Sequence, residues 1–243
     1  MRAYLSFELR RLVRDLRLTL FTVLGPVVTY LIFSGLPATG DRLEGVTATV
    51  ALMVGLAGYG AMAGVLSVGS SVAQERAVRW LHHLRVTPLP PRRVVAVKAL
   101  VGTLSAVPAL VAVGVAGRLQ HHVELSAGRW GALLVLMWAG TVPFALLGLA
   151  IGYGLTPQLA PPANFLAFLG LSVLGGLLVP VAYFPDVLRH LAHALPTYRF
   201  AELGWRAAGG LSPSPSGLAV LAGWTVVFAA LAAAAYRRST ARR

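Results

Sequence analysis

Long apolar stretches recur along the chain, and short polar or basic segments separate them. A helix needs roughly 20 residues to cross about 30 Å of hydrocarbon. Stretches of about that length lie near residues 18–36, 46–71, 96–117, 130–155, 164–183 and 217–236. The pattern therefore predicts an all-α integral membrane protein, with six transmembrane helices in one domain that covers residues 1–243.

The first residues predict an amphipathic helix instead of a span. Over residues 2–16 the apolar side chains fall on one helical face and the arginines fall on the other. The apolar face holds Leu5, Leu9, Leu12, Val13 and Leu16, and the basic face holds Arg10, Arg11 and Arg14. Such a helix lies in the membrane interface, with its arginines toward lipid phosphates.

The composition excludes several classes of protein. Hydrophobic residues make up 57% of the chain and charged residues only 12%, whereas soluble domains carry about 25% charged residues. A soluble enzyme, a disordered chain and a free nucleic-acid-binding domain are therefore excluded. The net charge of +13 indicates contact with membrane lipid, because basic residues flank spans and set their orientation. Cysteine is absent, which excludes disulfides and thiolate sites.

The distribution of basic residues predicts the topology. With the amino terminus inside, 15 of the 21 Lys and Arg residues fall on the inner side of the six spans. By the positive-inside rule, both termini are expected in the cytoplasm of a cell that carries this protein in its plasma membrane.

The chain offers no evident chemistry of its own. Lys98 is assigned to the inner polar segment, and the spans are interpreted as free of ionisable side chains, which ion-coupled carriers require. The sequence lacks a phosphate-binding loop and a His-Glu-x-x-His motif. We therefore expect no catalytic, cofactor-binding or metal site, no enzyme activity, and an energy source outside this chain.

The segment between the second and third spans is the sharpest feature. Between Ala73 and Leu89 it predicts a short cytosolic helix that Pro88 ends. Its apolar face holds Ala73, Ala77, Trp80, Leu81 and Leu84, and its charged face holds Glu75, Arg79 and His82. Either the helix docks on another protein, or the segment is a basic loop that only fixes topology.

A second segment, residues 184–216, is too polar to cross the membrane and too apolar for a free loop. It predicts two short helices that re-enter the outer leaflet. An amphipathic loop lying on the outer surface is the alternative.

The loop motif resembles that of ATP-binding-cassette type-2 permeases. The resemblance rests on Glu75-Arg76, Trp80, the run Leu84-Arg85-Val86-Thr87-Pro88-Leu89, and Lys98. The amino-terminal basic helix that leads into Gly25-Pro26-x-x-x-Tyr30 and the order of spans are also similar. Arg79 departs from the family, in which glycine often precedes the tryptophan.

The resemblance implies a half-transporter. Two permease copies, or this chain and a similar one, would sit on separate ATPase subunits that bind ATP and Mg. The helix from Glu75 to Arg85 would be the coupling helix, and the amino-terminal helix would be the interface helix beside it. The coupling contacts would come from Glu75, Arg76, Arg79, Trp80, Leu84 and Arg85.

Side chains within the spans suggest where a substrate passes. Polarity or aromaticity selects Tyr30, Tyr59, Asn164 and Phe168 as candidates to line a path. The predicted function is therefore the membrane subunit of an ATP-driven exporter for a hydrophobic or amphipathic substrate such as a drug, lipid or natural product. A stand-alone membrane scaffold or assembly factor is the alternative.

Small residues predict close helix contacts. Gly60-x-x-x-Gly64 and Gly148-x-x-x-Gly152 allow two helices to approach closely. Packing within the chain is favoured over a seam between two copies.

Overall fold

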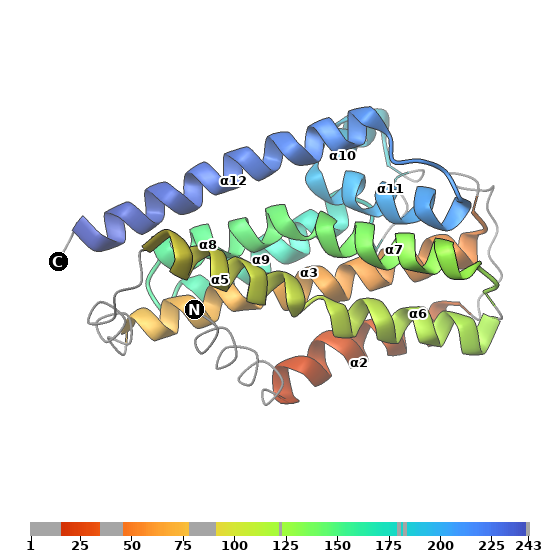
Figure 1. Ribbon diagram of the computed structural model, residues 1–243, viewed down its shortest axis with the longest axis horizontal. Coiled ribbons are helices and arrows are strands. Elements are labelled where there is room, and N and C mark those ends of the chain that lie inside the picture. Colours follow the sequence, from red (N-terminus) through yellow and green to blue (C-terminus); the bar gives the residue numbers. More distant parts are fainter. Residues whose placement is uncertain are drawn as a thin grey trace.

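The computed structural model describes residues 16–34, 46–77, 91–121, 123–178, 181 and 184–241, and these ranges are almost entirely helical. The described helices form an elongated bundle (Figure 1). They are α2 (Leu16–Phe33), α3 (Ala48–Ala77), α5 (Pro91–Leu104), α6 (Val107–His121), α7 (Ala127–Gly140), α8 (Val142–Gly154), α9 (Ala160–Leu174), α10 (Asp186–Ala194), α11 (Pro196–Gly209) and α12 (Pro215–Ala241).

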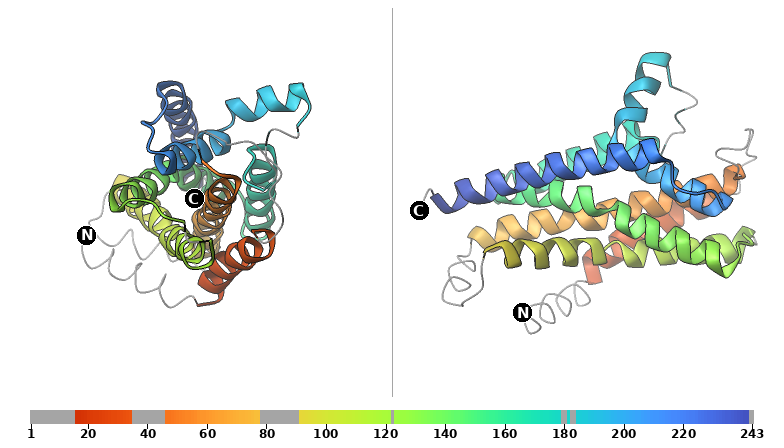
Figure 2. Two further views of the ribbon diagram at one scale, coloured as in Figure 1. Left: turned by 90° about the vertical axis from the view of Figure 1, so that its right-hand side faces the viewer. Right: turned by 45° about the horizontal axis from the view of Figure 1, so that its top comes forward.

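Helix α3 is the centre of the bundle. It packs against α2, α5, α6, α8, α9 and α11, and the end-on view shows it surrounded by other helices (Figure 2). Its 30 residues make a rod of about 45 Å at 1.5 Å per residue. Apolar and small residues occur all around this helix, as expected for one enclosed by neighbours.

The structure confirms four of the predicted spans as long apolar helices. These are Ala48–Ala77, Val97–His121, Ala127–Gly154 and Pro215–Ser239. The other two predicted spans fall on shorter apolar helices, Thr22–Phe33 and Ala160–Leu174. The predicted span 164–183 is shifted, because α9 begins at Ala160 and ends before Gly176, whose φ of 79° is incompatible with a continuing helix.

Two of the long apolar stretches are broken near their middle. The break between α5 and α6 lies at Ser105–Ala106, shortly before Pro108, and the break between α7 and α8 lies at Thr141, shortly before Pro143. Proline removes a backbone donor and clashes with the preceding turn. The hydroxyl groups satisfy nearby carbonyls: Ser105 donates to Gly102 and Thr141 donates to Trp138, both at 2.6 Å.

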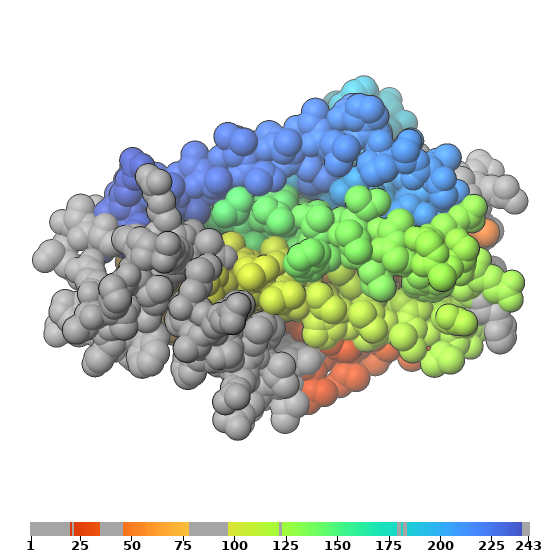
Figure 3. All heavy atoms as spheres, viewed as in Figure 1, coloured from red at the N-terminus to blue at the C-terminus, as the bar shows by residue number. Residues whose placement is uncertain are grey.

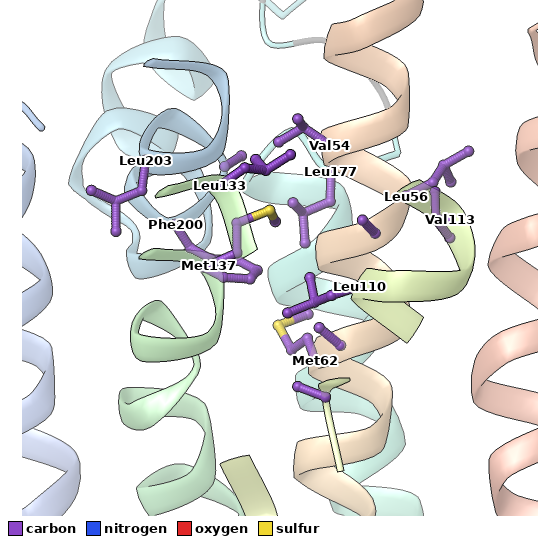
Figure 4. Close-up of a cluster of buried hydrophobic side chains, with 14 of the residues drawn as sticks. Val54, Leu56, Met62, Leu110, Val113, Leu133, Met137, Leu177, Phe200 and Leu203 are labelled. Atoms are coloured by element: carbon purple, nitrogen blue, oxygen red, sulfur yellow. The ribbon is translucent and has the colours of Figure 1, made fainter. Parts of the chain in front are cut away.

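The largest cluster of buried apolar side chains fills the space between α3, α6, α7 and α11. Figure 4 shows these side chains pointing toward one another from the surrounding helices. They include Val54, Leu56, Met62, Leu110, Val113, Leu133, Met137, Leu177, Phe200 and Leu203. This cluster therefore packs α11 against α3 and α7.

The prediction that glycine pairs pack within the chain is confirmed. A Cβ atom at Gly64 would lie 2.8 Å from the carbonyl oxygen of Ser105, and one at Gly60 would lie 2.8 Å from that of Thr22. Gly148 and Gly152 face α3 in the same way. These glycines let the helix backbones touch.

Residues 184–216 contain two helices, as one of the two interpretations requires. α10 is largely exposed, whereas α11 is buried along most of its length. α12 then runs along one side of the molecule (Figure 3), and only 17% of its most apolar 18-residue stretch is buried. The predicted interface helix 2–16, with Arg10, Arg11 and Arg14, lies outside the described residues.

Candidate functional site

The last turn of α3 carries a buried ion pair. The Nζ atom of Lys98 on α5 lies 2.8 Å from each carboxylate oxygen of Glu75. The Lys98 side chain is 2% exposed and that of Glu75 is 6% exposed. Removing one partner of a buried pair leaves an uncompensated charge and costs about 3–5 kcal/mol. The pair therefore fixes the last turn of α3 to the middle of α5.

This geometry corrects two predictions. Glu75 was expected on an exposed charged face beside Arg79, but α3 continues to Ala77 and buries Glu75 against α5. Lys98 was counted with the inner polar segment and the spans were expected to lack ionisable side chains, but Lys98 lies inside the apolar helix Val97–His121, within the predicted span 96–117. The bundle accepts both charges because they neutralise each other and face its interior.

Arg76 joins the same helix end to α8. Its guanidinium group donates to the backbone oxygens of Gly152 at 2.9 Å, Tyr153 at 2.6 Å and Leu155 at 3.3 Å. These carbonyls belong to the carboxyl end of α8, where the helix leaves acceptors without intrahelical donors. A cation there also stabilises the helix dipole. Arg76 thus acts as the cap of α8.

The α3 and α8 backbones touch near this cap. A Cβ atom at Gly69 would overlap the carbonyl oxygen of Gly148, and one at Gly152 would overlap the carbonyl oxygen of Gly69. Contacts this close require glycine on both helices. They leave α3 and α8 little freedom to slide past each other.

Together these contacts make a three-helix junction, which we call the basal junction. It consists of Glu75, Arg76, Lys98 and the α8 backbone oxygens of Gly152, Tyr153 and Leu155. It lies at the end of the bundle that also holds the carboxyl terminus (Figure 1). Segment 78–90 joins α3 to α5 at this junction and carries Arg79, Trp80, Leu84 and Arg85, all outside the described residues.

Three of the four predicted substrate-path residues come together where α3 faces α9. The rings of Tyr59 and Phe168 lie 4.6 Å apart. Asn164 donates a hydrogen bond of 2.9 Å from its Nδ2 atom to the Oγ atom of Ser70 on α3. Tyr30 is separate: it is fully buried on α2, edge-on to His121 at 5.9 Å.

A second polar network lies at the opposite end of the molecule. Glu202 on α11 accepts from the Nη1 atom of Arg199 at 2.8 Å and from the Oγ atom of Ser214 at 2.7 Å. The His193 ring stacks on Tyr198 at 4.3 Å. Burial and the positive charge of Arg199 lower the pKa of His193. This network joins α10, α11 and the start of α12.

Sequence reasoning missed three partners: Lys98 for Glu75, the α8 carbonyls for Arg76, and Ser70 for Asn164. One signal was available for the first. Lys98 is the only lysine of the chain and stands at the start of an apolar stretch, where an ionisable residue is expected to have a partner. Backbone acceptors carry no signal in the sequence, so the cap of α8 could not have been found.

Comparison with known proteins identifies the family. Residues 1–204 match the family model described as "ABC-2 type transporter". The chain belongs to the ABC-2 type transporter family. The resemblance seen in the loop motif is thereby confirmed.

A relative supports the same assignment. The chain is 23% identical over 222 residues to the Bacillus subtilis (strain 168) protein named "Putative transport permease YvfS", covering 91% of this chain and 90% of the relative. An ABC-2 protein is a transport permease of the membrane and not an enzyme. Membership also implies, in general terms, an ATP-binding-cassette ATPase as partner.

Proposed function

We propose that this permease is the membrane subunit of an exporter that is driven by ATP hydrolysis on a separate subunit. The observation that carries the proposal is the buried ion pair between α3 and α5, the two helices that segment 78–90 connects in the sequence. A docking segment must pass force to the membrane helices, and this segment connects α3 to α5, which a buried ion pair ties together at the last turn of α3. A loop that only fixed topology would have no need of such an anchor.

The docking contacts come from the part of the motif beyond the junction. Arg79, Trp80, Leu84 and Arg85 contact the ATPase subunit, which binds ATP and Mg. Glu75 and Arg76 do not face that subunit in this proposal, because both are engaged inside the bundle. The helix of residues 2–16 lies beside the docking segment at the membrane surface.

The substrate passes along the face where α3 meets α9. Tyr59 and Phe168 offer an aromatic surface there, and Asn164 and Ser70 offer a polar one. Such a surface suits a hydrophobic or amphipathic molecule. In this proposal a second permease copy completes the path, and Phe165 and Leu166 on α9, which are more than half exposed, offer it an apolar surface.

Two observations support a plasma-membrane topology with both termini in the cytoplasm. Fifteen of the 21 basic residues fall on the proposed inner side, and the last turn of α3, which precedes segment 78–90 in the chain, lies at the end of the bundle that holds the carboxyl terminus (Figure 1). The basic residues then face the anionic inner leaflet.

Reconstitution tests the proposal. The permease is coexpressed with a candidate ATP-binding-cassette ATPase subunit from the same genome, purified, and placed in vesicles, where ATP-dependent uptake of rhodamine 6G, an amphipathic dye, is measured. We expect copurification, uptake that requires ATP, and no ATPase activity from the permease alone. If the permease does not copurify with the ATPase and no ATP-dependent uptake is seen, the stand-alone scaffold is favoured.

A tryptophan substitution tests the docking segment. Trp80→Ala removes a large apolar anchor, and such interface residues contribute at least about 2 kcal/mol, so the affinity for the ATPase should fall roughly 30-fold. Trp224→Ala at the opposite end of the bundle is the matched control. Equal affinities for both variants would contradict the docking role.

A further inference from the structure

The basal junction is built differently from the rest of the bundle. Elsewhere α3 meets its neighbours mainly through apolar and small side chains, with uncharged hydrogen bonds at Ser70 and Ala51, whereas its last turn uses two charged residues that point to two different helices. Glu75 holds α5 and Arg76 holds α8, although the two residues are adjacent in the chain. Adjacent residues of a helix point about 100° apart, so one turn ties three helices.

Burying charges to make this connection carries a desolvation cost. A buried ion pair is often no more stabilising than well-packed apolar residues of similar volume. Its advantage is directional, because an ion pair and a multidentate arginine fix one geometry. Stability alone therefore does not explain the junction.

The contacts of α3 show what a fixed geometry can do. From Glu75 the helix runs without a break to Tyr59, 16 residues away, which is about 24 Å. The Gly69, Gly148 and Gly152 contacts keep α8 against it over part of that distance. A displacement at the junction is thus carried to the α3–α9 face by two helices moving as one body.

We infer that Lys98 and Arg76 are positioning residues: through them, force applied to segment 78–90 moves α3, α5 and α8 together instead of bending the end of one helix. This inference rests on the proposed function. It assigns to Glu75, Arg76 and Lys98 a role in transmission within the membrane subunit, distinct from docking on the ATPase.

The test separates transmission from assembly and from folding. The readout is the ATPase rate per assembled complex, divided by the rate of the ATPase subunit alone, in vesicles of Escherichia coli polar lipid. Copurification and thermal unfolding of each variant are measured beside it. Asp186→Asn is the matched control, since it breaks an ion pair of 3.3 Å whose side chains are 84% and 45% exposed.

Three variants are compared with the parent. In Glu75→Gln the ratio should fall about tenfold, equivalent to about 1.4 kcal/mol, while affinity for the ATPase stays within about twofold. The exchanged pair Glu75→Lys with Lys98→Glu should recover most of the ratio. The neutral pair Glu75→Gln with Lys98→Met should unfold at the parent's temperature or above and still show the lowered ratio.

The outcomes distinguish this inference from the proposed function. If the parent permease neither binds nor activates the ATPase, the proposed function fails and the inference fails with it. If the parent activates the ATPase and the neutral pair does so equally, the inference alone is overturned. It is also overturned if all junction variants fail to fold while Asp186→Asn folds, because the pair would then serve only folding.

Discussion

The contact between the α3 and α8 backbones can be tested by adding single methyl groups. An ordinary Cβ contact begins near 3.4 Å, yet a Cβ atom at Gly69 would overlap the carbonyl oxygen of Gly148. In Gly69→Ala the two helices must therefore separate by on the order of 1 Å. Backbone is rigid on both sides, so no flexible side chain can relieve the overlap.

The expected cost follows from known overpacking effects. Extra methyl groups in a packed interior cost about 1–3 kcal/mol, and the separation also strains the Arg76 cap, whose two shorter bonds are 2.6 and 2.9 Å. The better helix propensity of alanine returns up to about 1 kcal/mol. We expect a net loss of about 2 kcal/mol, which lowers Tm by roughly 4–8 °C for a chain of this size.

Glycines in open positions provide matched controls. Gly131 on α7 and Gly223 on α12 have no atom within 4 Å of an added Cβ. Gly131→Ala and Gly223→Ala should therefore leave Tm unchanged or raise it. Thermal unfolding in dodecyl maltoside, followed by tryptophan fluorescence, measures all three variants.

A double substitution refines the test. Gly152→Ala overlaps the carbonyl oxygen of Gly69, so it forces the same separation as Gly69→Ala. Once the helices have moved apart, the second methyl group costs less, and the combined loss should be smaller than the sum of the two. A Tm for Gly69→Ala equal to that of Gly131→Ala would refute the reasoning.

Three further predictions concern the cap, the topology and the effect of pH. Arg76→Ala should lower stability by about 2 kcal/mol because a charged donor to three carbonyls is lost; an unchanged unfolding temperature would contradict the cap. In Ser126→Cys and Ser239→Cys variants, a membrane-impermeant maleimide applied outside cells should label position 126 and not 239, and the reverse order would contradict the topology. The folded state lowers the pKa of His193 below its ordinary value of 6.5. The contribution of His193 to the free energy of unfolding is therefore complete above pH 6.5 and is lost as the pH falls through the lowered pKa. Unfolding midpoints of His193→Phe should depend less on pH in that interval than those of the parent, and an identical pH dependence would exclude the effect.

The hydrophobic pattern predicted which segments are helical more reliably than it predicted where each helix begins and ends. The apolar stretch 46–71 located α3, but the helix continues six residues further to Ala77 because Lys98 neutralises Glu75 inside the bundle. A pattern that counts charges as ends of a span cannot find a charge that has a partner in another helix. For the same reason Lys98 was counted with the inner polar segment, although the predicted span 96–117 contains it.

Helix breaks and long-range contacts lay beyond sequence reasoning for a different reason. Both breaks lie close to a proline, Pro108 or Pro143, whereas Pro26 lies within α2 without a break. The difference depends on the neighbouring helices, which the sequence does not place. At the two breaks the hydroxyl groups of Ser105 and Thr141 donate to the carbonyls of Gly102 and Trp138, three residues earlier. The candidate path was predicted in part, since Tyr59, Asn164 and Phe168 meet at one face and Tyr30 does not.

The central position of α3 has a consequence for biosynthesis. Chains fold from the amino terminus as they are made, and α3 emerges before α5, α6, α8, α9 and α11, each of which packs on it. Arg76 is in place before α8 presents the carbonyls that it caps. Each later helix therefore enters the membrane after α3, on which it packs, has been made. α12 packs mainly on α8, so it docks last.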